Sequence, residues 1–221
     1  MENIPGVRLS SRFVGRMRVR YIIISIVLLV ALLCVTAYSL FKHPTLLNFA
    51  HGTAADVAGL KAAWAKGEII VFVRHAERCD QSDASCLGAK DGITVRGSDE
   101  ARGVGKEYQR LGLQSTDIFS SPLTRTTQTA TFMFEHAVAT QEWLANCRMT
   151  LLANAIKQKV VGRNLILVTH SDCIREIERD LKIKLPHKPA YTSSLFISID
   201  EKNTVPHALG FIEAAPFSAD F

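Results

Sequence analysis

Two apolar segments, each running directly into a histidine, constrain the fold of this chain more than any other feature. The first is IIVFV at 69–73, followed by Arg74 and His75, and the second is NLILVT at 164–169, followed by His170. Their apolar residues are continuous rather than alternating, which is typical of strands buried on both faces of a sheet. Helix-forming stretches separate the expected strands, at 54–68, 98–112 and 172–181. The sequence therefore predicts an α/β domain with a largely parallel sheet.

A long apolar segment near the N-terminus predicts a membrane span. Residues 21–41 contain no charged side chain, and a helix of that length, rising about 1.5 Å per residue, crosses a hydrocarbon core of roughly 30 Å. Five arginines precede the segment within residues 1–20, while Lys42 and His43 follow it. By the positive-inside rule the N-terminus stays in the cytoplasm and the rest of the chain is exported.

A cleaved signal peptide is the alternative to an anchor, because VTA at 35–37 resembles a cleavage site. The apolar segment is longer than a typical signal core, which favours the uncleaved anchor. We therefore expect a basic cytoplasmic leader at 1–20, a transmembrane signal anchor at 21–41, a tether at 42–54 and a folded domain at 55–221.

The charge of the chain is concentrated in the leader. The formal net charge is +5, and residues 1–20 hold five arginines against Glu2, a net of +4, so the remainder carries about +1. A nearly neutral domain lacks the basic surface of a nucleic-acid-binding protein, so we expect no nucleic-acid partner.

The cysteines agree with export. Cys34 lies in the apolar segment, and the other four form an even set: Cys79, Cys86, Cys147 and Cys173. In an oxidising compartment an even set predicts two disulfides, with three pairings open. Cys79 with Cys86 closes the shortest loop, which would leave Cys147 with Cys173. Four free thiols are the alternative, and the absence of a CxxC pair disfavours a zinc site.

A third segment, FSSPLTRTTQTA at 119–130, follows another expected strand. Ser121 has the character of a helix N-cap and Pro122 that of a first helical residue, which places Arg125 in or near the first turn. The free N–H groups and the positive dipole end of a helix N-terminus attract anions.

Two histidines and two arginines are thus expected at one edge of the sheet. In α/β sheets ligands bind beyond the carboxyl ends of the strands, where His75 and His170 fall. The planar forks of Arg74 and Arg125 suit bidentate binding of phosphate. Each of these residues alone is more often structural, and it is the ordered set that predicts a site for a tetrahedral oxyanion.

That ordered set resembles the histidine phosphatase superfamily, also called phosphoglycerate mutase-like. The resemblance spans about 68–200 and rests on VRHAE at 73–77, FSSPLTRTTQTA at 119–130 and LVTHSD at 167–172. It implies a three-layer α/β/α fold with a mostly parallel sheet. Further features, FVRHAERCD, CLGAKDGITVRG, Cys147, Cys173 and the export segment, look like the Ais-type lipopolysaccharide core heptose(II)-phosphate phosphatases.

The resemblance implies a covalent mechanism without a metal or cofactor. His75 would attack phosphorus and form a phosphohistidine, which water then hydrolyses. A nucleophilic His75 must be neutral, and neighbouring guanidinium groups should lower its pKa. Arg74, Arg125 and His170 would stabilise the charge on the transferring phosphoryl oxygens.

Two departures from the family pattern concern the loop after the nucleophile and the proton donor. Ala76 stands where the family usually has glycine, and Asn146 falls where many members place a catalytic glutamate. An amide cannot donate the proton, so Asp172 is our first candidate for proton donor and Glu77 the second. Glu142 is a weaker candidate, and a good leaving group would need no donor.

We expect the substrate to be a phosphorylated envelope glycolipid or sugar phosphate, with specificity set by the loops at 78–97 and 181–193. The expected location is the bacterial inner membrane, attached by 21–41 with the domain in the periplasm, or soluble in the periplasm after cleavage. One alternative is a phosphohistidine or phosphoprotein phosphatase, which the predicted topology disfavours. Another is a phosphate-binding envelope module without turnover. Neither the oligomeric state nor the exact substrate follows from the sequence.

Overall fold

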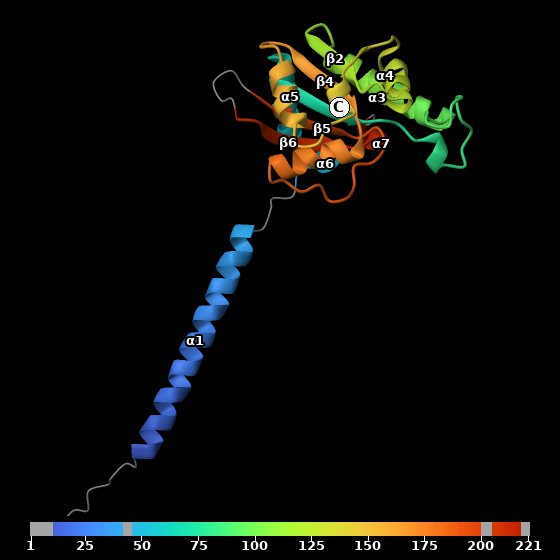
Figure 1. Cartoon of the computed structure of the whole chain (residues 1–221). Helices are drawn as coiled ribbons and strands as arrows, with labels where there is room; N and C mark the ends of the chain where they lie inside the picture. Colours follow the sequence, from blue (N-terminus) through green and yellow to red (C-terminus); the bar gives the residue numbers. More distant parts are fainter. Residues whose placement is uncertain (1–10, 42–45, 200–204, 218–221) are drawn as a thin grey trace, which may run out of the picture. The chain divides into compact units, whose positions relative to one another are not determined.

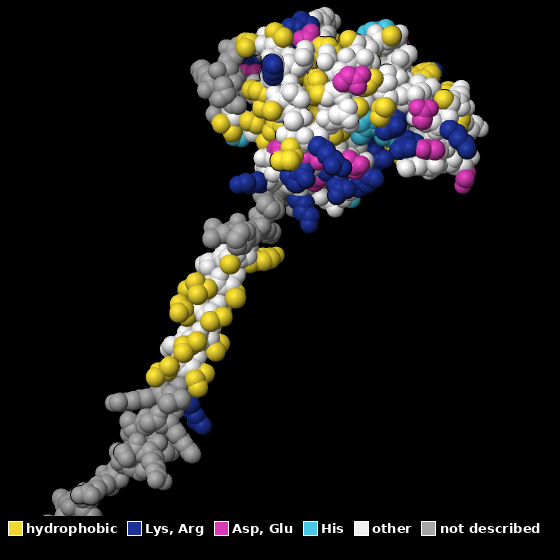
Figure 2. All heavy atoms as spheres, in the orientation of Figure 1, with side chains coloured by type: hydrophobic (Ala, Val, Ile, Leu, Met, Phe, Trp, Pro, Cys, Tyr) yellow, Lys and Arg dark blue, Asp and Glu magenta, His cyan; other side chains and the backbone are white. Residues whose placement is uncertain are grey.

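The computed structural model describes residues 11–41, 46–199 and 205–217, which form two units. The first unit is helix α1 (Ser11–Phe41). Within it, Arg20–Ser39 is long and apolar enough to cross a membrane, and none of that window is buried. Hydrophobic side chains lie along the visible face of α1 over this length (Figure 2), and the large apolar side chains between Tyr21 and Tyr38 are exposed. The helix begins at Ser11, well before the apolar span, and so includes part of the arginine-rich segment.

The second unit contains a six-stranded mixed sheet (Figure 1). Its strands are β1 (Ile69–Arg74), β2 (Thr116–Ser120), β3 (Ala139–Thr140), β4 (Asn164–Thr169), β5 (Ser194–Ser198) and β6 (His207–Ile212). The spatial order is β3-β2-β4-β1-β5-β6. The first four strands in this order run parallel, whereas β5 is antiparallel to β1 and to β6. The prediction of a mostly parallel sheet is confirmed.

Helices cover both faces of this sheet. They are α2 (Ala54–Ala65), α3 (Val95–Leu111), α4 (Thr124–Phe134), α5 (Leu151–Gln158), α6 (Ser171–Asp180) and α7 (Ala214–Phe217), with 3-10 turns η1 (Phe49–His51), η2 (Cys79–Gln81) and η3 (Glu142–Leu144). Val71 of β1 packs in one core with residues of α2, α3, α4 and α7, and Phe72 packs in a second core with residues of α5 and α6. Alternate β1 side chains thus enter two cores, which explains its continuous apolar sequence and confirms the three layers.

The chain joins the α/β domain earlier than the expected tether implied. Residues 42–45 lie outside the described part of the chain, and from Leu46 onward the backbone packs on the domain. Phe49 is buried and meets the ring of Phe196 edge to face, with centroids 5.7 Å apart. A Cβ atom on Gly210 would lie 2.6 Å from the Phe49 ring, so glycine is needed for this close approach.

Two disulfides fasten the segments around the carboxyl edge of the sheet. Cys79 is bonded to Cys86 and Cys147 to Cys173, with Cα–Cα distances of 5.4 and 5.6 Å. The first closes the loop after η2, and the second joins the segment after η3 to α6. Cys34 of α1 is free.

Candidate active site

The two strand-end histidines lie together because β1 and β4 are adjacent and parallel. Arg74 is in register with Thr169, and the backbone N–H of His75 donates to the carbonyl of Thr169 at 2.9 Å. The imidazole rings of His75 and His170 are 5.4 Å apart between centroids. Both are nearly buried, with 3% and 9% of their surface exposed.

A main-chain carbonyl fixes the protonation pattern of His75. Its Nδ1 lies 2.8 Å from the carbonyl oxygen of Ala76, which can only accept a hydrogen bond, so Nδ1 carries the proton. In the neutral ring Nε2 then holds a free lone pair. Burial, together with the charges of His170, Arg74 and Arg125, lowers the pKa of His75 to about 3, although the hydrogen bond to the carbonyl of Ala76 acts in the opposite direction. The ring is therefore neutral and potentially nucleophilic at neutral pH.

The lowered histidine pKa values predict an acid-side loss of stability. Burial also lowers the pKa of His170, to about 4. Between about pH 4 and 6.5 these two histidines are protonated in the unfolded chain but stay neutral in the folded chain. The free energy of unfolding should therefore fall as pH falls through this window. Denaturant unfolding of the wild type and His75→Gln at several pH values measures it. We expect a slope shallower by up to about one proton in the variant, and an identical slope would contradict the assignment.

Three buried nitrogens at the site have no hydrogen-bond partner among the described residues: Nε of Arg74, Nε of Arg125 and Nδ1 of His170. Arg74 is otherwise held firmly, because Nη1 donates to the carbonyl of Pro189 at 2.6 Å and its guanidinium carbon lies 3.9 Å from the ring centre of Tyr191. Buried unpaired donors are costly, and a tetrahedral oxyanion offers acceptors in several directions. The two arginines and His170 thus have the chemistry of an anion site.

The structure corrects the expected role of Ser121. Helix α4 begins at Thr124 with Leu123 as its N-cap, so Ser121 does not cap it. Ser121 is instead buried just beyond β2, and its Oγ lies 3.0 Å from Nε2 of His170. When this hydroxyl donates to Nε2, the proton of neutral His170 resides on Nδ1, the nitrogen without a partner. Arg125 lies in the first turn of α4, as expected.

Arg78 is a third arginine at the site that sequence reasoning missed. Its positive charge lowers the pKa of both His170 and Arg125. Its Nε donates to Oδ1 of Asp80 at 2.7 Å, and its side chain is 24% exposed. The spacing of Arg74 and Arg78 in the segment RHAER was the available signal.

Two further residues support the site without having been predicted. Oγ1 of Thr129 accepts the backbone N–H of Ala76 at 2.9 Å and donates to the carbonyl of Arg125 at 2.6 Å, so it joins the nucleophile loop to α4. Tyr191 lies over Arg74, and its ring centroid is 5.7 Å from that of His75. The threonine-rich sequence of α4 was a signal for the first, whereas nothing in the sequence singled out Tyr191.

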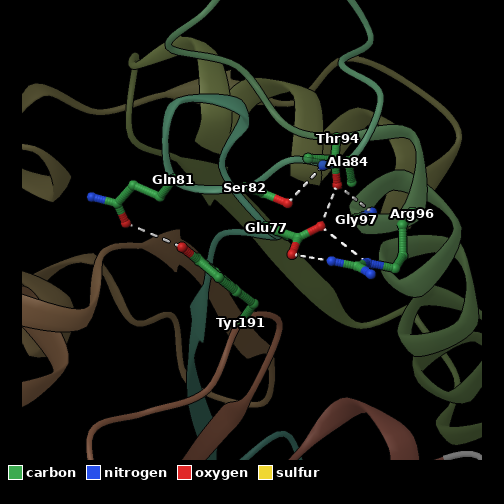
Figure 3. A network of polar contacts seen from close by, with 8 residues as sticks. All are labelled: Glu77, Gln81, Ser82, Ala84, Thr94, Arg96, Gly97 and Tyr191. Carbon is green, nitrogen blue, oxygen red and sulfur yellow. Dashed lines mark hydrogen bonds and ion pairs between the residues drawn. The ribbon is translucent and has the colours of Figure 1, made fainter.

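Glu77 occupies a position that does not suit a proton donor. Its carboxylate accepts hydrogen bonds from both Nε and Nη2 of Arg96 at 3.1 and 2.5 Å and from Oγ1 of Thr94 at 2.7 Å (Figure 3). The bond to Arg96 is the main reason that its pKa lies below the ordinary value. An ionised, fully bonded carboxylate anchors the nucleophile loop to the start of α3 instead.

The other acid candidates are more exposed. Asp172 lies in the first turn of α6 with an 85% exposed side chain and is 3.9 Å from Arg175. Burial lowers the pKa of both Arg74 and His170, and the charge of Asp172 partly opposes this lowering, so Asp172 acts on the same site. Glu142 and Asn146, in and just after η3, are exposed. Among the described residues, no group of three or more metal-binding side chains is placed to hold an ion.

Residues 70–147 match the Histidine phosphatase superfamily (branch 1). The chain is 33% identical over 135 residues to a lipopolysaccharide core heptose(II)-phosphate phosphatase of Escherichia fergusonii, covering 60% of this chain and 69% of the relative. A protein of the same name from Salmonella typhimurium is 34% identical over 130 residues, covering 58% of this chain and 64%, less than two thirds, of the relative.

Solved structures of the same architecture support the fold. The putative phosphohistidine phosphatase SixA from Agrobacterium tumefaciens matches with a TM-score of 0.52 and 18% identity, covering 66% of this chain and 99% of that one. A phosphoserine phosphatase mutant from Entamoeba histolytica matches with a TM-score of 0.52 and 16% identity, covering 67% and 98%. At such identities these likenesses show the fold alone. The family match and the curated relatives go further, and the chain belongs to the histidine phosphatase superfamily and is a phosphatase.

Proposed function

We propose that this phosphatase hydrolyses phosphomonoesters through a phosphohistidine formed on His75. The observation that carries the proposal is the state of that ring. It is buried and neutral, its Nδ1–H is bonded to the carbonyl of Ala76, and its Nε2 is left with a lone pair. A nucleophile needs a free lone pair in a fixed direction, and the arginines and His170 beside it supply donors for the phosphoryl group.

The reaction would proceed in two displacements. Nε2 of His75 forms a bond to phosphorus while the bond from phosphorus to the alcohol oxygen breaks, and the departing oxygen takes a proton. Water then attacks the phosphohistidine, releases inorganic phosphate and restores the ring. Arg74, Arg125 and His170 act at the phosphoryl oxygens in both steps, since preorganised donors stabilise the charge that develops there. Arg78 adds positive charge at the same place.

For the proton donor we retain Asp172. Two observations support it over Glu77: its charge acts on Arg74 and His170, and its exposed carboxylate is not held by several hydrogen bonds. Glu77, by contrast, is fixed by Arg96 and Thr94.

The substrate we propose is a heptose phosphate of the lipopolysaccharide core, because the curated relatives are named lipopolysaccharide core heptose(II)-phosphate phosphatases. We also propose that the leader at 1–20 stays in the cytoplasm, that 21–41 anchors the chain in the inner membrane, and that the phosphatase domain lies in the periplasm. The apolar window Arg20–Ser39 and the two disulfides support an exported, oxidised domain.

Mass spectrometry of lipopolysaccharide from cells with and without the protein tests this proposal. Cells producing the wild type should lose one phosphate group from a core heptose, and cells producing His75→Ala should not. A chain without residues 1–41, which lacks the export segment, should also leave the core unchanged. Removal of the phosphate by that shortened chain would refute the exported location, and an unchanged core with the wild type would refute the substrate.

A further inference from the structure

An open pocket of about 600 Å³ shares Tyr191 with the surroundings of His75 and takes no part in the chemistry described above. It is lined by Glu77, Arg96, Asp99, Glu100, Ala190 and Tyr191. Its volume is in the range of pockets that bind small molecules. The pocket therefore has room for a substrate group larger than phosphate.

Tyr191 connects this pocket to the anion site. It lines the pocket, and its ring lies over the guanidinium group of Arg74 and near the ring of His75. Its hydroxyl donates to Oε1 of Gln81 at 3.2 Å, which ties the ring to the end of η2 (Figure 3). The ring of Tyr191 thus lies between the anion site and the pocket, so the alcohol portion of a phosphomonoester bound at His75 could extend past this ring into the pocket.

The charges of the pocket differ in sign from those of the anion site. Three carboxylates and one guanidinium line it, a net formal charge of −2. Glu77 is bonded to Arg96, and Asp99 accepts a hydrogen bond from Arg102 at 2.7 Å. Such a surface repels a second acidic group on the substrate, whereas hydroxyl groups can donate to its carboxylates.

Glu100 is the carboxylate in this pocket whose bonding capacity is least used. No described lysine, arginine or histidine lies within ion-pair distance of it, and it is half-buried. The side chain of Thr192 lies within hydrogen-bonding reach, yet burial is the larger effect and raises the pKa of Glu100. A partly buried carboxylate with spare acceptor positions is suited to bind hydroxyl donors of a ligand.

We propose that this pocket binds the alcohol portion of the phosphomonoester, and that Tyr191 and Glu100 select an uncharged polyhydroxylated group over an acidic one. The inference rests on the proposed function, since it assigns the two halves of one substrate to two adjoining sites. Tyr191 supplies an apolar face for the ring of a sugar, and Glu100 accepts hydrogen bonds from its hydroxyl groups. The loop at 181–193 and the start of α3 would then share the specificity.

The test compares three phosphomonoesters with the full chain in detergent: a mannose phosphate, phosphoglycolate with its acidic alcohol portion, and p-nitrophenyl phosphate without hydroxyl groups. We expect Glu100→Gln to lower the ratio of kcat/KM for mannose phosphate to that for p-nitrophenyl phosphate about tenfold, the effect of one hydrogen bond to a charged group. Glu100→Lys should raise the relative rate for phosphoglycolate. Glu68→Gln is the matched control, because it makes the same change just before the opposite end of β1. It should leave the kcat/KM values for mannose phosphate and phosphoglycolate, each relative to p-nitrophenyl phosphate, as in the wild type.

Equal loss on all three compounds would show that Glu100 only supports the fold, and an unchanged kcat/KM for all three would show that the pocket takes no substrate; either result overturns the inference. Failure of the proposed function has a different signature, namely no hydrolysis by the wild type or full hydrolysis by His75→Ala. Calorimetric titration of the three compounds into His75→Ala, with and without Glu100→Gln, reads the pocket without turnover. Equal affinities in the two backgrounds would also refute it.

Discussion

Replacing His75 with alanine should lower kcat/KM for phosphomonoesters by at least about 10⁴-fold, the scale on which loss of a covalent nucleophile acts. The reason is geometric, since Nδ1 of His75 is bonded to the carbonyl of Ala76, which leaves its Nε2 with the lone pair that attacks phosphorus. His170 differs from His75 in this respect, because its Nε2 lies 3.0 Å from the hydroxyl of Ser121. Steady-state kinetics with p-nitrophenyl phosphate measures the effect.

Trapping of the acid-labile phosphohistidine adds a chemical readout to this prediction. After brief reaction with a labelled phosphomonoester, the wild type should carry base-stable, acid-labile phosphate on His75. The matched control is His207→Ala, which removes an exposed histidine at the start of β6 and should retain the label and the rate. Full activity in His75→Ala, together with an unlabelled wild type, would exclude the covalent mechanism.

Replacing Arg74 with lysine should lower kcat/KM about 10²- to 10³-fold, close to the effect of alanine at the same position. The guanidinium group does three things at once. It donates to the carbonyl of Pro189 and it stacks on Tyr191. Its buried Nε, which has no partner among the described residues, is available to donate to the phosphate. An ammonium group has neither the plane to stack nor the fork to reach two acceptors, so the positive charge alone should not restore the rate.

Inhibition by vanadate distinguishes lost phosphate binding from a general loss of structure. The inhibition constant should rise in Arg74→Lys, while the thermal unfolding midpoint stays near that of the wild type. Arg163→Lys is the matched control, because Arg163 pairs with Asp117 at the other end of the sheet. If lysine at position 74 supports normal rates, the bidentate role assigned to Arg74 is wrong.

The central sheet and the placement of its histidines were predictable from the sequence because both depend on local pattern. Continuous apolar residues at 69–73 and 164–169 are what a strand between two helical layers requires. Parallel pairing then brings the strand ends together, which is why Arg74, His75 and His170 follow from sequence position alone.

Contacts across long sequence separations were not predictable in the same way. Tyr191 covers Arg74 from a loop more than a hundred residues later, and no periodicity marks such a pair. Ser121 has the composition of an N-cap, but its burial beyond β2 turns its hydroxyl toward His170 instead. The sequence makes Glu77 a candidate proton donor because it does not reveal the partner of this carboxylate. That partner, Arg96, lies at the start of α3, whose position in space no local pattern indicates.

The atoms that orient His75 have a consequence for how mutations would affect this enzyme. Its Nδ1–H donates to the carbonyl of Ala76, and its own backbone groups bond the carbonyl of Thr169 and the N–H of Thr192. All three partners are main-chain groups, which every amino acid supplies, apart from the N–H that proline lacks. Drift in the side chains at these positions therefore leaves the tautomer of the nucleophile unchanged as long as the backbone keeps its path. An exchange between glycine and alanine at position 76 is a change that such an arrangement can absorb.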